Sequence, residues 1–183
     1  ATLVGMTASK GVPVIESAER FAIGAATALQ MLGDVPADAS AILLACFGDP
    51  GLIGLRQRAG VPVIGMAEAT AMAAQQAGHR LAIVTAGAAW VPLLSQAVRA
   101  LVPQLTLTGV YALPGNGADL RRSPAAFRTG VAALSRQAAD DGATALTLGG
   151  AAFAGLDFDI DPRLARVDTM DAVAAAFTAR ETT

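Results

Sequence analysis

The chain has 183 residues, of which 54% are hydrophobic, 15% charged and 4% aromatic. This length fits one domain, or two small lobes that share one chain, and so high a hydrophobic fraction excludes an intrinsically disordered protein. Fifteen acidic and thirteen basic residues give a net charge of −2. Because the basic residues are spread along the chain, we expect no binding to nucleic acid.

From residue 41 onward, short apolar runs alternate with longer amphipathic stretches, and glycine or proline stands at the joints. The first predicted helix has Asp49 as its N-cap, Pro50 in its first turn and Gly60 at its end. In chain order, the pattern predicts strands at residues 41–45, 61–65, 81–85, 105–113 and 143–148. The helices predicted between and after them cover residues 50–59, 68–76, 92–101, 124–141 and 170–180.

Strands that alternate with helices predict an α/β fold, in which a mostly parallel sheet is flanked by helices. The apolar runs lack the alternation of polar and apolar residues, which is typical of strands buried on both faces. In such sheets ligands bind at the carboxyl ends of strands, beside helix N-termini. The candidate site is therefore confined to residues 46–51, 85–90 and 149–155.

The chain contains one cysteine, Cys46, and one histidine. One cysteine excludes an internal disulfide and a cysteine-rich zinc site, and we expect no metal. The apolar runs are broken before the ~18–20 residues that a membrane span needs, and no signal peptide is visible. We expect a cytoplasmic protein that does not bind membranes. Because the chain begins at Ala1 rather than methionine, we also expect that an N-terminal piece is missing.

Cys46 is the strongest candidate for a chemical role. At a turn between a strand and a helix, the amides and dipole of the helix should lower the pKa of its thiol from ~8.5. The alternative is a buried structural cysteine, since cysteine is among the most buried residue types.

Two further segments allow a functional and a structural interpretation. The amides of Gly149, Gly150 and Ala151 could hold a carboxylate or a developing oxyanion, or the glycines could serve a tight turn. The run that holds Asp157 and Asp161 lacks the glycine and glutamate of a calcium loop, so a solvated turn is expected there. The sequence contains neither the P-loop motif G-x-x-x-x-G-K-S/T nor the dinucleotide-binding motif G-x-G-x-x-G.

Residues 45–52, Ala-Cys-Phe-Gly-Asp-Pro-Gly-Leu, closely resemble the first active-site motif of hydantoin racemases in the aspartate/glutamate racemase family. The similarity continues at residues 62–69, 83–85 and 90–94, and more weakly at 11–17. It implies two pseudo-symmetric α/β lobes with the site in the cleft between them. The first lobe would comprise residues 1–78, without its opening strand, completed by residues 157–183, and the second lobe residues 79–156.

The resemblance also implies a mechanism without cofactor or metal. Family racemases place one cysteine at a strand end in each lobe, on opposite faces of the substrate α-carbon. One thiolate removes a proton and the other thiol returns one. Cys46 aligns with the first cysteine and Thr85 with a substrate-pocket threonine, whereas Gly150 stands where the second cysteine is expected. A glycine cannot donate a proton, so the opposing proton would come from water or from the missing segment.

We therefore expect a cofactor-independent racemase or isomerase acting at the acidic α-carbon of a hydantoin or amino acid. Cys46 would be the thiolate base, and the amides of Phe47, Gly48, Gly150 and Ala151 would hold substrate oxygens, with Gly149 beside them. One alternative is a single-cysteine decarboxylase, or a cis–trans isomerase of small dicarboxylates. Another is a non-catalytic relative that binds a small molecule. The resemblance further implies a homo-oligomer.

Overall fold

The computed structural model describes residues 2–153, 156 and 158–181, and these residues form two parallel sheets. The first sheet pairs β1 (Ile42–Leu44) with β2 (Val63–Gly65). The second has the order β4-β3-β5-β6, made of β3 (Arg80–Ala86), β4 (Thr106–Leu113), β5 (Ala145–Gly149) and β6 (Ala165–Arg166). Each pair of neighbouring strands is parallel, which confirms the predicted α/β class.

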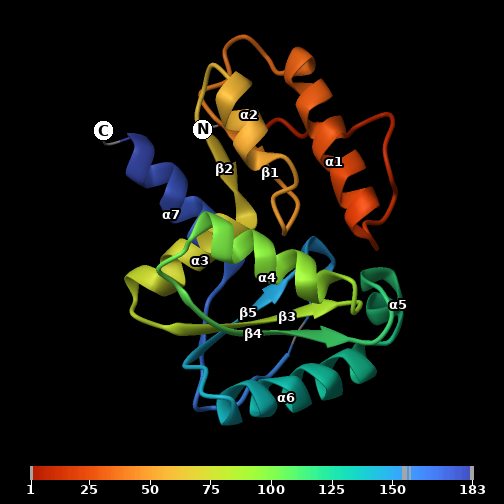
Figure 1. Cartoon of the computed structure of the whole chain (residues 1–183), viewed down its shortest axis with the longest axis vertical. Coiled ribbons are helices and arrows are strands. Elements are labelled where there is room, and N and C mark those ends of the chain that lie inside the picture. The colour runs from red at the N-terminus through yellow and green to blue at the C-terminus, as the bar shows by residue number, and fades with distance from the viewer. Residues whose placement is uncertain (1, 154–155, 157, 182–183) are drawn as a thin grey trace.

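Helices cover both sheets (Figure 1). The first sheet lies beside α1 and α2, while α3 and α4 lie on one face of the second sheet and α6 on the other. The bounds are α1 (Ala18–Gln30), α2 (Leu52–Arg58), α3 (Met66–Gln76), α4 (Trp90–Leu101), α5 (Gly117–Arg122), α6 (Pro124–Asp140) and α7 (Thr169–Glu181), with 3₁₀ turns at Met31–Asp34 and Ala151–Phe153. Among the described residues, no helix is long and apolar enough to cross a membrane.

The central strand β3 is buried on both faces, as its apolar sequence predicts. Leu81 and Ile83 pack into a cluster with side chains of α3 and α4. Ala82 and Val84 point to the other face, into a cluster with Phe127 of α6. Successive residues of a strand point to opposite faces, so two apolar layers require an unbroken apolar run.

Every predicted strand and helix is present, with small shifts at the ends. One of these shifts concerns α2, which begins at Leu52 instead of directly after Asp49. Asp49 and Gly51 have left-handed backbone torsions, with φ of 53° and 82°, so the chain makes a turn before the helix can start. The sequence reasoning missed α1, α5 and β6. The first of these buries no residue completely, and the other two are six and two residues long.

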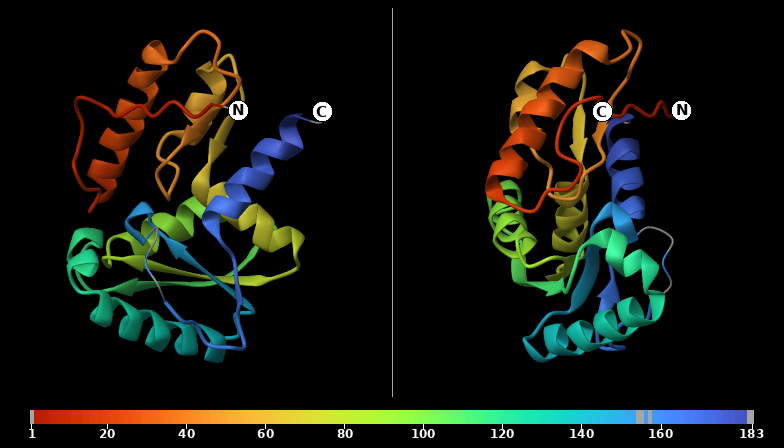
Figure 2. Two further views of the ribbon diagram at one scale, coloured as in Figure 1. Left: turned by 180° about the vertical axis from the view of Figure 1, so that it is seen from behind. Right: turned by 90° about the vertical axis from the view of Figure 1, so that its right-hand side faces the viewer.

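The division into lobes stays a prediction, and the last segment links the two sheets. β6 lies within residues 157–183, which were assigned to the first lobe, yet it pairs with β5 of the second sheet. From there the chain enters α7, which packs against α3 and β2. Both views in Figure 2 show α7 leaving the second sheet toward the first.

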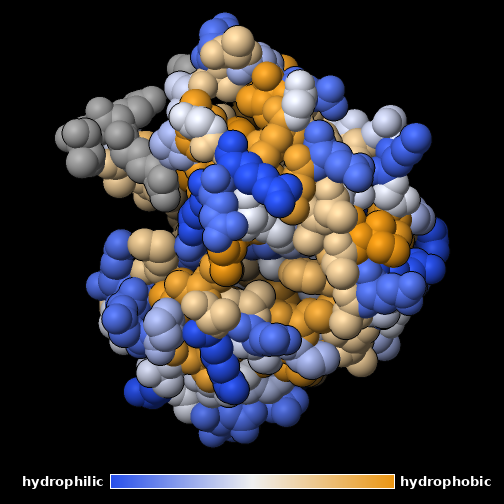
Figure 3. Space-filling model, turned by 45° about the horizontal axis from the view of Figure 1, so that its top comes forward, coloured by the Kyte–Doolittle hydropathy of each residue, from blue (hydrophilic) through white to orange (hydrophobic). Residues whose placement is uncertain are grey.

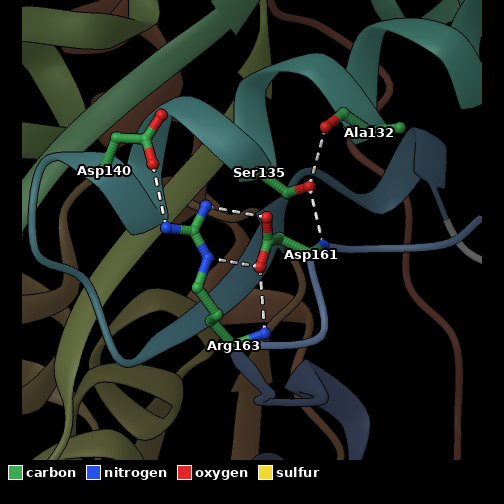
Figure 4. Close-up of polar contacts among 5 residues, drawn as sticks. All are labelled: Ala132, Ser135, Asp140, Asp161 and Arg163. Carbon is green, nitrogen blue, oxygen red and sulfur yellow. Dashed lines mark hydrogen bonds and ion pairs between the residues drawn. The ribbon is translucent and has the colours of Figure 1, made fainter.

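The predicted turn before β6 is present, with Pro162 and Arg163 exposed, and it is held by ion pairs (Figure 4). The Arg163 guanidinium donates two hydrogen bonds of 2.9 Å to Asp161 and one of 2.9 Å to Asp140 at the end of α6. The amide of Asp161 donates to Ser135 Oγ on α6, also at 2.9 Å. The Arg163 side chain lowers the pKa of Asp161 to about 2. Asp157, the other end of the acidic run, lies outside the described residues.

Candidate functional site

A cavity of about 210 Å³ opens where the carboxyl ends of β1, β3 and β5 approach one another. Such strand ends are where ligands bind in α/β sheets. Figure 3 shows that hydrophobic and hydrophilic residues are intermixed on the face of the molecule that it presents. Of the predicted site residues, the cavity is lined by Cys46, Phe47, Thr85, Gly149, Gly150 and Ala151.

Gly48 is the predicted site residue that does not line this cavity in the described part of the chain. It is buried behind Trp90, with φ of 135°. A Cβ atom at this position would lie 2.7 Å from the Trp90 ring, closer than any side chain tolerates. The glycine therefore lets the turn after β1 pack against the indole, and Gly48 is not part of the cavity lining.

Cys46 lies in a tight turn at the end of β1. Its amide donates to the Leu44 carbonyl at 2.9 Å, and its carbonyl accepts from the Asp49 amide at 3.0 Å. The residue is partly buried and its thiol is free. The turn thus fixes the backbone on both sides of the sulfur and presents the side chain to the cavity.

The expectation of a lowered thiol pKa is wrong. Burial raises the pKa of Cys46 to about 11, and the negative charge of Asp49 adds to the effect. Desolvation and a nearby like charge both disfavour the thiolate. Cys46 does not stand at the N-terminus of a helix, because α2 begins only at Leu52. In the free protein Cys46 is therefore a protonated thiol at neutral pH.

Asp49 is a buried carboxylate attached to the start of α3. Its side chain accepts hydrogen bonds from the amides of Glu68 at 2.8 Å and Ala67 at 3.2 Å. Glu68 in turn forms an ion pair with Arg56 of α2, and the Arg56 guanidinium also donates to the Val63 carbonyl at 3.0 Å. The Cys46 turn, α2, β2 and α3 are thereby joined in one polar network.

Thr85 is buried near the carboxyl end of β3, where it pairs with Gly149 of the neighbouring strand β5. Its hydroxyl donates to the Gly149 carbonyl at 2.8 Å. The hydroxyl proton is therefore already used, and the oxygen can only accept a hydrogen bond from a substrate N–H group.

The two glycines after β5 differ in what they tolerate. A Cβ at Gly149 would lie 2.8 Å from Ile83 and 2.9 Å from Phe47, so close packing requires glycine there. A Cβ at Gly150 would lie 3.3 Å from the Phe153 ring, and its φ is outside the left-handed region. A small side chain at position 150 thus needs a shift of only a few tenths of an ångström.

Trp90 lies within the predicted segment 85–90, whereas Glu16 and Asn116 are lining residues that sequence reasoning missed. Trp90 both lines the cavity and packs edge-to-face on Phe21, with ring centroids 6.2 Å apart. Asn116, at the end of β4, also lines it while its side chain caps α5, and the Asn-x-x-Asp spacing could have revealed this cap. Glu16 is the one charged side chain in the lining formed by the described residues, which includes no lysine or arginine.

Comparisons with known proteins agree with this arrangement. A sequence profile of the family described as Asp/Glu/Hydantoin racemase matches residues 1–179. No curated protein matches the chain in sequence.

Several solved structures share the fold. Allantoin racemase from Pseudomonas fluorescens is 26% identical, with a TM-score of 0.84 over 96% of this chain and 76% of that one. Allantoin racemase from Klebsiella pneumoniae is 28% identical, with a TM-score of 0.71 over 93% and 71%. Glutamate racemase RacE1 from Bacillus anthracis, 16% identical with a TM-score of 0.60 over 91% and 66%, shows a likeness of fold alone. The chain therefore belongs to the Asp/Glu/hydantoin racemase family.

Proposed function

We propose that the protein is a cofactor-independent racemase that acts at the acidic ring carbon of an uncharged cyclic ureide, such as a 5-substituted hydantoin or allantoin. The observation that carries this proposal is the position of Cys46 in a cavity at three converging strand ends. The family and the two allantoin racemases of similar structure support it.

The charge of the lining favours a neutral ring over the amino acids and dicarboxylates that the sequence left open. Carboxylate ligands are commonly held by arginine or lysine, and neither lines the cavity within the described residues. The Glu16 carboxylate would repel a dianionic substrate. A ureide ring instead offers N–H groups, and the hydroxyl oxygen of Thr85 could accept a hydrogen bond from one of them.

The chemistry requires one proton to leave the ring carbon and another to arrive on the opposite face. The ring carbonyl delocalises the carbanion, so a modest base suffices. Because the resting Cys46 is a thiol, it would first lose its proton to water. The thiolate would then remove the proton from one enantiomer, and the thiol would donate a proton to form that enantiomer in the reverse direction. Because Gly150 carries no acid, water would exchange the proton on the other face.

A panel of substrates tests the proposed class. Polarimetry should show loss of optical rotation for a 5-substituted hydantoin or allantoin, and none for glutamate or aspartate. Cys46→Ala should remove the enzymatic rate above the spontaneous one. Racemisation of an amino acid, with the ureides unchanged, would contradict the proposed substrate class.

One-sided protonation is a second candidate, because the resting Cys46 is a thiol and therefore a ready proton donor. A decarboxylase needs only this half-reaction. Release of carbon dioxide from an arylmalonate, lost in Cys46→Ala, would favour it over racemisation. Thermal stabilisation by a ureide without any Cys46-dependent reaction would instead indicate a non-catalytic binding protein.

A further inference from the structure

Asp49 occupies an unusual place for a carboxyl group. It is 4% exposed and has a left-handed backbone, which is uncommon for a residue with a side chain. Its carbonyl accepts from the Leu52 amide at 3.1 Å, while its own amide donates to Cys46. One residue thus holds the end of the Cys46 turn and the start of α2 together.

The side chain of Asp49 has a second set of partners. It reaches the two amides at the start of α3, 18 and 19 residues further along the chain. Gly65 makes room for it, since a Cβ there would lie 2.4 Å from the Asp49 carboxylate. The turn that carries Cys46 is therefore anchored to α3 through one carboxyl group.

We propose that Asp49 is a positioning residue for Cys46: its carboxyl group ties the turn that carries the thiol to α3, and its protonation sets the negative charge that the thiol senses. The ionisable groups around Asp49 are Cys46 on its own turn, Glu68 on α3 and Arg56 on α2. Burial raises the pKa of Asp49 to about 6, against the opposing effect of the α3 amides. The charge beside the thiol is accordingly lost as the pH falls through 6.

Alkylation of Cys46 by iodoacetamide tests this proposal without any substrate, because the chain has no other cysteine. The rate follows the thiolate fraction. In the wild-type protein, the logarithm of the alkylation rate should rise linearly with pH above pH 7. Below pH 6 the measured rate should exceed the value extrapolated from that line, because Asp49 is then protonated and no longer disfavours the thiolate. Asp49→Asn should give one straight line that exceeds the wild-type rate at pH 8 by up to about tenfold, the change for one pKa unit.

Asp161→Asn is the matched control, since it removes a carboxylate outside the cavity and should leave the wild-type profile unchanged. Thermal unfolding verifies that each variant is folded. If Asp49→Asn does not fold, the bend in the wild-type plot of alkylation rate against pH still tests whether the charge of Asp49 acts on the thiol. A straight wild-type profile, or coincident profiles for wild type and folded Asp49→Asn, would overturn the proposal.

The inference rests on the proposed role of Cys46, but the two can fail separately. A bent alkylation profile in a protein that racemises no ureide would refute the proposed function and leave the link between Asp49 and Cys46 intact. In an active enzyme, Asp49→Asn should also alter the pH dependence of kcat, which a purely structural residue would not do.

Discussion

Cys46 and Gly150 define what the cavity can do chemically. The sequence located Cys46 correctly at a strand end, because a short apolar run followed by glycine and proline is a local pattern. It did not give the direction of the pKa shift. That shift arises from burial and from Asp49, whose orientation depends on contacts with α3. Local sequence thus predicts where the thiol lies, and tertiary contacts decide its protonation state.

Gly150→Cys should increase racemisation, because it adds a thiol at the end of β5 on the wall of the same cavity. The backbone permits a side chain, and only the Phe153 ring must move slightly. A positioned general acid or base contributes on the order of 10²-fold or more to a rate. We expect a gain of that order in kcat on the ureide substrate, measured by polarimetry. Gly150→Ala is the control, and an equal rate for both variants would contradict the expectation.

Gly65→Ala should destabilise the protein, because the new methyl group would collide with the Asp49 carboxylate and with Leu52, 2.7 Å away. Forced overpacking costs about 1–3 kcal/mol in the free energy of unfolding. Urea unfolding followed by circular dichroism measures the change. Gly60→Ala, where nothing lies within 4 Å of the new methyl group, should have little effect. Equal unfolding midpoints for the two variants would show that the Asp49 pocket adapts.

Among the helices and strands, those that form because of their own residue pattern are predictable, whereas those that form because of contacts with other segments are not. Three strands of the second sheet, β3, β4 and β5, are apolar runs that the sequence predicts to within a few residues. β6 has two residues, both exposed, and exists because it pairs with β5 and because Arg163 holds the preceding turn. Nothing in its own sequence indicates a strand. The ion pairs at Arg163 therefore determine where the chain turns toward α7.

Arg163→Ala should lower the melting temperature at pH 7. The pKa of Asp161 is lowered in the folded protein, so its contribution is present above about pH 4 and is lost as the pH falls toward 2. The difference between wild type and variant should shrink accordingly between pH 5 and pH 2.5, as measured by calorimetry. Arg128→Ala, on the exposed face of α6, is the control. A difference that is constant with pH would show that the ion pair does not contribute.

For the whole molecule, the alternation of strands and helices predicted the α/β class and the parallel strands. It could not predict the cavity, which forms only where two separate sheets bring their strand ends together. The lining residues Glu16, Trp90 and Asn116 come from segments whose meeting depends on that arrangement. The lobe boundaries and the homo-oligomer stay predictions. The family membership is the feature that the motif around Cys46 and the comparisons support jointly.

The most direct test of the account is deuterium exchange with single enantiomers. Each enantiomer of a 5-substituted hydantoin is incubated in D₂O with the wild-type protein and with Cys46→Ala, and mass spectrometry and chiral chromatography follow the product. We predict that the wild-type protein incorporates deuterium at the ring carbon and forms the opposite enantiomer, both faster than Cys46→Ala. Equal exchange and inversion in the two proteins would contradict the role of Cys46 as the proton-transferring group.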